Sequence, residues 1–169
     1  QNKPKHTDIN NYLNDLTHAW YSLHAFDHIF CGEKSGRSIG GLHFHWRYQQ
    51  LESSNQICRM NNVNNNEVIE GTIYSMGVEM KLPNNEILRH SIKGYGLTLN
   101  ASDILLSATK ALAENHTSSN KSEHCILTLN DGDARYDMVF VRRNNGIRTY
   151  YPDATPDKKP CAKTISLHH

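Results

Sequence analysis

Hydrophobic side chains recur along this chain with two different periods, and each period predicts its own kind of element. Between Asp8 and Leu23 the apolar residues fall near helical spacing, which predicts an amphipathic helix that supports the rest of the fold. A clearer helix is predicted to begin at Asn100, a good N-cap, with Asp103 in its first turn. Apolar residues at positions 104, 105, 108, 111 and 112 give that helix one buried stripe.

Strand-like stretches occupy much of the remaining chain. The stretches 68–82 and 86–99 are predicted to be strands joined by the turn Pro83-Asn84-Asn85. Three more strands are predicted at 124–129, 136–142 and 147–151, the last two joined by an Asn145-Gly146 turn. The Gly/Ser-rich stretch 32–41 has no hydrophobic period and is predicted to be a loop, and 42–51 is a helix or a strand. This order of helices and hairpins indicates an α+β fold and not a wound parallel sheet.

Composition adds few constraints. The chain has 169 residues and a formal net charge of +1, so nucleic-acid binding would need a local basic patch. The C-terminal part offers one candidate patch, made of Arg142, Arg143, Arg148, Lys158, Lys159 and Lys163, which can equally be a solvated face. Mean hydropathy is −0.66, and no apolar run approaches the roughly 20 residues of a membrane helix. The four cysteines show no zinc-site spacing, and they permit disulfides without requiring them.

Histidines are the most informative residues, because two of them flank the Gly/Ser-rich stretch. His28 and His43 can be structural residues, as most of the 11 histidines must be. They can be metal ligands, since His24 and His28 share a helical face and His43 and His45 share a strand face, although a third ligand is missing. They can also be a proton acceptor and a proton donor, because imidazole titrates near neutral pH.

Two motifs decide between these interpretations. "FDHIFCGE" at 26–33, followed by "GGLHF" at 40–44, resembles the paired histidine motifs of the EndoU endoribonucleases, with the two histidines 15 positions apart. "GIRTYYPD" at 146–153 resembles the ending that this family shares with the coronaviral uridylate-specific endoribonuclease. The resemblance covers roughly residues 26–153, and it implies the EndoU nuclease fold and RNA cleavage by the 2′-hydroxyl without a cofactor or metal.

The resemblance also implies roles for individual residues. His28 and His43 match the two catalytic histidines, and which is the base and which the acid stays open. Lys93 in "HSIKGYG" matches the catalytic lysine best, with Lys81 as the second candidate. An ammonium in this position would stabilise charge that develops on the phosphorane.

Substrate contacts are expected from the C-terminal part of the chain. Thr149 and Tyr151 match positions that contact ribose and base, and as residues i and i+2 of a strand they share one face. Thr98 matches only loosely the family's Ser or Thr after the lysine, so the base preference stays open. Arg148 is expected to hold a flanking phosphate, and Trp46, Tyr95 or Tyr151 to stack on a base.

The expected organisation is a single domain, 1–169, with two lobes. A helical extension (1–25) precedes a histidine-bearing N-terminal lobe (26–82), and the C-terminal lobe (83–165) has an antiparallel sheet, one main helix and Lys93. The chain is most similar to compact bacterial EndoU toxin domains of contact-dependent growth inhibition systems. That similarity implies tRNA as substrate, a cognate immunity protein as partner, and delivery within a larger exported protein to a target-cell cytoplasm. The alternatives are an inactive RNA-binding module and a metal-dependent hydrolase.

Overall fold

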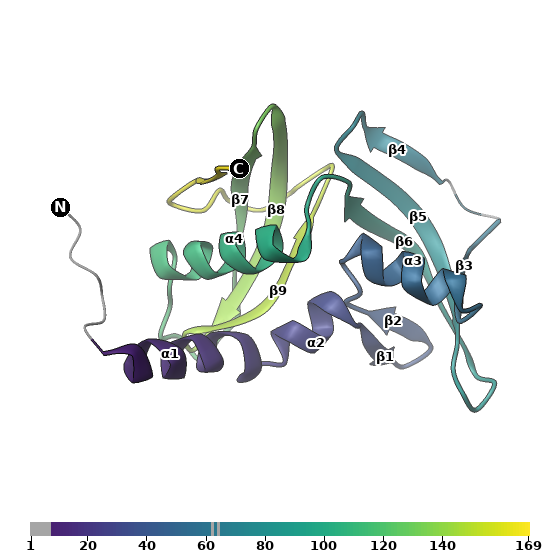
Figure 1. Ribbon diagram of the computed structural model, residues 1–169, viewed down its shortest axis with the longest axis horizontal. Coiled ribbons are helices and arrows are strands. Elements are labelled where there is room, and N and C mark those ends of the chain that lie inside the picture. Colours follow the sequence, from purple (N-terminus) through teal and green to yellow (C-terminus); the bar gives the residue numbers. More distant parts are fainter. Residues whose placement is uncertain (1–7, 62, 64) are drawn as a thin grey trace.

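Two lobes lie side by side in the computed structural model, each with its own sheet (Figure 1). The structure describes residues 8–61, 63 and 65–169. The lobe at the left of Figure 1 holds the helices α1, α2 and α4 and the strands β7 to β10. The other lobe holds α3 and the strands β3 to β6, and the small hairpin β1–β2 lies between α2 and this second sheet. The expected α+β fold is confirmed.

The first lobe is built on three antiparallel strands in the order β7 (Glu123–Asp131), β8 (Ala134–Arg143) and β9 (Gly146–Pro152). A short strand, β10 (Ile165–Leu167), adds to β7 in parallel. The β8–β9 turn lies one residue earlier than predicted. Asn144 and Asn145 are its two central residues, and both have positive φ, as a two-residue type I′ turn requires.

Helix α4 (Ala101–Glu114) covers one face of this sheet (Figure 1). Its start is the predicted one, since the Asn100 side chain accepts a hydrogen bond from the Asp103 backbone and the Asp103 side chain accepts one from Asn100, a reciprocal capping box. Its apolar stripe packs on the large buried side chains of the sheet, among them Tyr136, Phe140 and Tyr150.

Helices α1 (Ile9–Tyr21) and α2 (Ala25–Phe30) belong to the same core. Asp8 caps α1, and the indole of Trp20 is buried and donates a hydrogen bond to the Thr109 hydroxyl of α4 at 2.9 Å. Ile29 and Phe30 of α2 are buried beside β9. The expected N-terminal extension is therefore an integral part of the core of the C-terminal lobe, and α2, which carries His28, is fixed to that lobe.

The second lobe contains α3 (His45–Ser53), β3 (Ile57–Arg59), β4 (Asn66–Ile69), β5 (Ile73–Lys81) and β6 (Ile87–Gly96) around a separate core. The stretch 42–51 is thus resolved as mostly helix. The stretch 32–41, predicted to be a loop, instead forms the hairpin of β1 (Glu33–Ser35) and β2 (Ser38–Gly40). Only one of its six strand residues, Ile39, is buried, so the hydrophobic pattern gave no sign of it.

The boundary between the lobes differs from the expected one at residues 82 and 83. The Pro83-Asn84-Asn85 turn joins β5 and β6 as a hairpin, and β6 pairs with β5 along its length, so that Lys93 lies opposite Met76. Lys93 therefore belongs to the sheet of the N-terminal lobe and not to that of the C-terminal lobe. The lobes meet where β6 passes β9, and a Cβ at Gly94 would lie 3.2 Å from the Pro152 carbonyl oxygen.

A disulfide between Cys125 and Cys161 fastens the C-terminal segment to β7. Cys31 and Cys58 are free and exposed. None of the helices in the described part of the chain has the length and apolar character needed to cross a membrane.

Candidate active site

The segment 40–44 crosses the C-terminal end of α2 and brings the two histidines together. The Leu42 amide donates to the His28 carbonyl at 2.8 Å, and the His43 amide donates to the Ile29 carbonyl at 2.7 Å. Gly41 has φ of +63°, and a Cβ there would lie 1.8 Å from the His28 carbonyl oxygen. Only glycine permits this close approach, which gives a physical reason for the Gly-x-His pattern.

The imidazoles of His28 and His43 lie edge to face, with ring centroids 5.5 Å apart. His43 in turn stacks on the ring of Tyr151 from β9, with centroids 4.6 Å apart and an angle of 22° between the rings. The three rings thus form a row, Tyr151, His43 and His28, that connects the sheet of the C-terminal lobe to the end of α2.

Glu33 holds the imidazole of His28. Their atoms Oε1 and Nδ1 are 2.6 Å apart, and the His28 side chain is only 12% exposed. Because an ionised carboxylate can only accept, Nδ1–H must be the donor, which leaves Nε2 free for a substrate. Gly40 faces Glu33 across β1 and β2, where a Cβ would lie 2.9 Å from Oε1. The first glycine of "GGLHF" therefore leaves room for the Glu33 carboxylate, which lies within a quoted motif but had no role in the sequence analysis.

Lys93 reaches the same place from β6. Its side chain is buried, 5% of the residue being exposed, and its Nζ donates to the Gly41 carbonyl at 2.6 Å. Burial lowers the pKa of Lys93 to about 8, against the raising effect of the Glu33 charge. His28, His43 and Lys93 together are called the histidine–lysine group below.

The two imidazoles differ in their electrostatics. Burial holds the pKa of His43 well below its usual value, and the charges of Lys93 and His28 lower it further. Burial also lowers the pKa of His28, but there the hydrogen bond and charge of Glu33 oppose the shift. His43 is therefore neutral near pH 7, and His28 is the imidazole of the pair that more readily carries a proton.

Thr149 lies two residues from Tyr151 on β9, and both are partly buried, whereas Tyr150 between them is in the core. The predicted alternation is therefore observed. Within the described part of the chain, the Thr149 hydroxyl is buried without a hydrogen-bond partner. A buried hydroxyl usually has a partner, so the hydrogen-bonding capacity of this one is unused within the fold.

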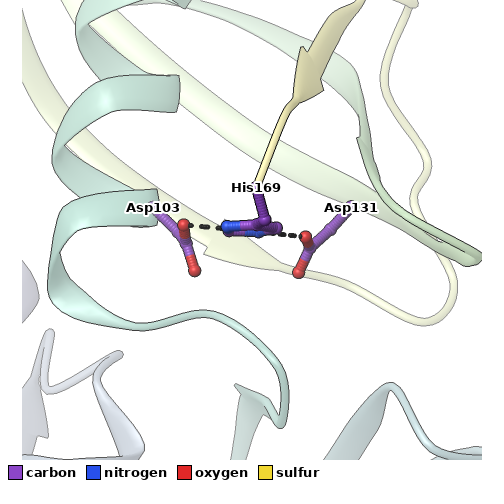
Figure 2. A group of neighbouring side chains, drawn as sticks. All are labelled: Asp103, Asp131 and His169. Atoms are coloured by element: carbon purple, nitrogen blue, oxygen red, sulfur yellow. Dashed lines mark hydrogen bonds and ion pairs between the residues drawn. The ribbon is translucent and has the colours of Figure 1, made fainter.

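The structure does not bring Thr98 into the group. Its hydroxyl contacts Asp131 at 2.7 Å and Tyr136 at 2.8 Å, in the core side of the C-terminal lobe. Asp131 also pairs with His169, which lies between Asp131 and Asp103 (Figure 2). Thr98 therefore helps to hold the C-terminus against α4. Its hydroxyl has a structural role in the C-terminal lobe.

Other predicted contacts fall into two classes. Arg148 is half-exposed near His28, with its guanidinium 3.5 Å from Glu33, and Trp46 is 55% exposed on α3. Arg142 is different, because its guanidinium is mostly buried against the Asn115 carbonyl and Glu123, so it is not part of a basic patch. Tyr95 is buried, with 1% of it exposed, and cannot stack on a base. Lys81 is the last residue of β5 and pairs with Ile87, whereas Lys93 pairs with Met76. The second lysine candidate is therefore at a different part of the sheet from Lys93.

The four histidines that metal binding would use do not converge. His24 is exposed in the turn before α2, and His45 hydrogen-bonds the Gly96 backbone. Among residues 8–61, 63 and 65–169, the three side chains of metal-ligand type whose ligand atoms gather are Asp103, Asp131 and His169. Both of these carboxylates already have partners in the fold, Asn100 for Asp103 and Thr98 for Asp131.

Comparison with known proteins agrees with this geometry. The model of the family described as "Bacterial EndoU nuclease" matches residues 22–154, which include the whole histidine–lysine group and Tyr151. The chain belongs to the bacterial EndoU nuclease family. The match ends just after β9, so Cys161 and β10 lie beyond the matched residues, whereas Cys125, the other cysteine of the disulfide, lies within them.

Two solved structures share the EndoU fold with this chain. XendoU, described as a splicing-independent snoRNA-processing endoribonuclease, has 16% identity and a TM-score of 0.59, with 94% of this chain and 58% of XendoU covered. The endoribonuclease Nsp15 of Middle East respiratory syndrome coronavirus has 15% identity and a TM-score of 0.52, with 90% of this chain and 42% of Nsp15 covered. This EndoU chain thus spans little more than half of one structure and less than half of the other. No curated protein matches it.

Proposed function

We propose that this EndoU nuclease cleaves RNA by attack of a 2′-hydroxyl on the adjacent phosphate, using His28, His43 and Lys93. The observation that carries the proposal is the convergence of these three side chains on the crossing segment 40–44, although they come from α2, a loop and β6. Two imidazoles of different basicity beside a buried ammonium supply a base, an acid and a charge for the transition state.

The electrostatics support one assignment of roles to the two histidines. Neutral His43 takes the proton of the 2′-hydroxyl, and the 2′ oxygen forms a bond to phosphorus. The bond from phosphorus to the 5′ oxygen of the next nucleotide breaks, and that oxygen takes a proton from His28 Nε2. The products are a 2′,3′-cyclic phosphate and a 5′-hydroxyl. Lys93 stabilises the negative charge that builds up on the non-bridging oxygens, and its low pKa also suits it to donate a proton there.

Substrate contacts on β9 support the same proposal. The free hydroxyl of Thr149 is suited to hydrogen-bond a ribose or base, and the exposed part of Tyr151 is suited to contact a base while its ring aligns His43. Arg148 is suited to contact phosphate, although it also pairs with Glu33.

The biological setting is part of the proposal and rests on the resemblance to compact bacterial EndoU toxin domains. In that setting the substrate is tRNA, a cognate immunity protein blocks the enzyme, and the nuclease acts in a target-cell cytoplasm after delivery within a larger exported protein. Identifying the cleaved RNA tests this setting independently of the chemistry.

The experiment is incubation of the purified chain with total tRNA in excess EDTA, followed by analysis of the product ends. We expect discrete fragments with cyclic phosphate ends, and no fragments with His43→Ala or His28→Ala. His116→Ala is the matched control, because His116 is exposed in the loop after α4. Cleavage that persists in either active-site variant contradicts the assignment.

The same experiment separates the two alternatives. An inactive RNA-binding module would bind tRNA equally well in all variants and leave it intact. A metal-dependent hydrolase would be silent in EDTA and active after metal is added back, with His24→Ala and His45→Ala as damaging as the other two.

A further inference from the structure

An open groove of about 620 Å³ lies beside His28. His28 and Glu33 form one side of it, and neither His43, Lys93 nor Tyr151 lines it. Tyr151 stacks on His43 and His43 contacts His28, and of these three rings only His28 lines the groove. Thr149 and Tyr151, the β9 residues expected to contact ribose and base, do not line it.

The groove also carries positive charge. Arg143 and Arg148 extend into it from the β8–β9 hairpin, and His24 lines it from the turn between α1 and α2. The hairpin is pressed closely against that turn, since a Cβ at Gly146 would lie 2.6 Å from the Ser22 hydroxyl oxygen. The groove is therefore a fixed feature of the contact between the helices and β9.

The two arginines differ in how free they are. Arg148 makes long contacts, at 3.4 Å to the Leu23 carbonyl and 3.5 Å to Glu33. The Arg143 side chain is exposed and makes no hydrogen bond or ion pair within the part of the chain that the structure describes. Asp27 and Glu33 also line the groove and repel anions, so a phosphate bound there needs direct contact with the guanidinium groups.

We propose that this groove binds the RNA strand on the 3′ side of the cleaved bond, with a backbone phosphate on Arg143 and Arg148. The inference rests on the proposed function, in which His28 gives its proton to the 5′ oxygen of the leaving nucleotide. That nucleotide is attached to this oxygen, so it must lie on the His28 side of the site, where the groove begins. The nucleotide on the 5′ side then lies against Thr149 and Tyr151, and the strand crosses the enzyme in one direction only.

Two modified oligonucleotides test this direction. Both have the sequence around the mapped cleavage site and a 2′-deoxy sugar at the cleaved nucleotide, which allows binding without cleavage. One carries an uncharged methylphosphonate in place of the first phosphate on the 3′ side of the scissile phosphate, and the other in place of the first phosphate on the 5′ side. The dissociation constants are measured by fluorescence anisotropy with wild type and with Arg143→Ala, because Arg148 is also paired with Glu33.

With wild type, the 3′ methylphosphonate should weaken binding about tenfold, the scale of one charge-assisted contact. Arg143→Ala should weaken binding of the unmodified oligonucleotide, and the 3′ methylphosphonate should then cost the variant less affinity than it costs wild type, because only Arg148 is left to contact that phosphate. The slope of log affinity against log salt should fall by about 0.7, as expected for one phosphate contact to a single strand. In cleavage assays KM should rise while kcat stays unchanged. Arg135→Ala, an exposed arginine at the other end of β8, should change none of these.

Two results would overturn the proposal. Independent, multiplying losses from Arg143→Ala and the 3′ methylphosphonate would mean that Arg143 does not contact this phosphate. If Arg143→Ala instead reduces the effect of the 5′ methylphosphonate and leaves that of the 3′ methylphosphonate unchanged, the strand runs the other way. In both cases wild type still cleaves RNA, whereas absence of cleavage by wild type removes the proposed function, and the strand direction with it.

Discussion

Lys93 should make the folded protein less stable at neutral pH, and replacing it should reveal by how much. Its ammonium has a pKa of about 8 in the folded protein, against an ordinary value of 10.5. At pH 7 the amine is charged in both the folded and the unfolded chain, so burial of the charge costs about 3 kcal/mol. Between pH 8 and 10.5 the unfolded chain binds more protons than the folded protein, and therefore stability should rise with pH. At pH 9.5 the remaining cost is about 1 kcal/mol.

Lys93→Met removes this charge from the core. It also removes the hydrogen bond to the Gly41 carbonyl, which costs about 1 kcal/mol. The variant should therefore be more stable than wild type by about 2 kcal/mol at pH 7 and about equal to it at pH 9.5. Its cleavage rate should fall at least about 100-fold, the scale of losing one preorganised donor.

Urea unfolding followed by circular dichroism at pH 7 and 9.5 measures both free energies. The free thiols Cys31 and Cys58 are alkylated first, so that they cannot exchange with the disulfide at high pH. Lys81→Met is the matched control, since Lys81 is exposed, and it should alter neither stability nor rate. If wild type and Lys93→Met change in parallel between the two pH values, then Lys93 is not a buried ammonium and the reasoning fails.

The remaining predictions concern the residues that hold His28 and His43 in position. Glu33→Gln removes the carboxylate that favours the protonated imidazole of His28. Because the Glu33 side chain is 41% exposed, solvent weakens its interaction with His28 and the expected effect is modest. The alkaline limb of the pH profile of kcat/KM should move to lower pH, because the Glu33 charge and hydrogen bond raise the pKa of His28, whereas Glu79→Gln, a surface partner of Arg89, should leave the limb in place. An unmoved limb in Glu33→Gln would separate Glu33 from catalysis. Gly41→Ala places a methyl group 1.8 Å from a backbone oxygen and should reduce cleavage at least about 100-fold through misplacement of His43. Gly36→Ala also has positive φ but open space around it, and it should lose only about 1 kcal/mol of stability with normal cleavage; equal activity losses in the two variants would contradict this account.

The elements that could be predicted from sequence are those with a long period or a good cap. Helix α4 has both, and β7 to β9 have apolar runs with turn residues between them. The hairpin β1–β2 could not be predicted, because its strands are short and mostly exposed. The boundary between the lobes was placed at a turn that in fact joins two paired strands, since a turn looks the same in sequence whether it ends a lobe or closes a hairpin.

The site was predictable to the extent that the motifs contain it. His28, His43 and Lys93 were selected by resemblance, and the structure brings all three together. Glu33 lies within the quoted motif, but its five-residue separation from His28 spans the end of a helix and the start of a strand. Only the folded chain shows that its carboxylate reaches the imidazole. Burial explains the errors at Arg142 and Tyr95, because a residue type does not tell which face of a strand will be covered.

The core that holds α2 is built from segments far apart in the sequence, α1 and α2 on one side and the β8–β9 hairpin on the other. This separation has a consequence for folding during synthesis. His18 contacts Asn144 and Leu23 contacts Arg148, across separations of 126 and 125 residues. A ribosome releases the N-terminal part first, so both histidines emerge long before β9 exists to hold them. Such distant contacts also close slowly. The nascent chain therefore carries both histidine motifs without an assembled site, and that site can form only after β9 has been translated.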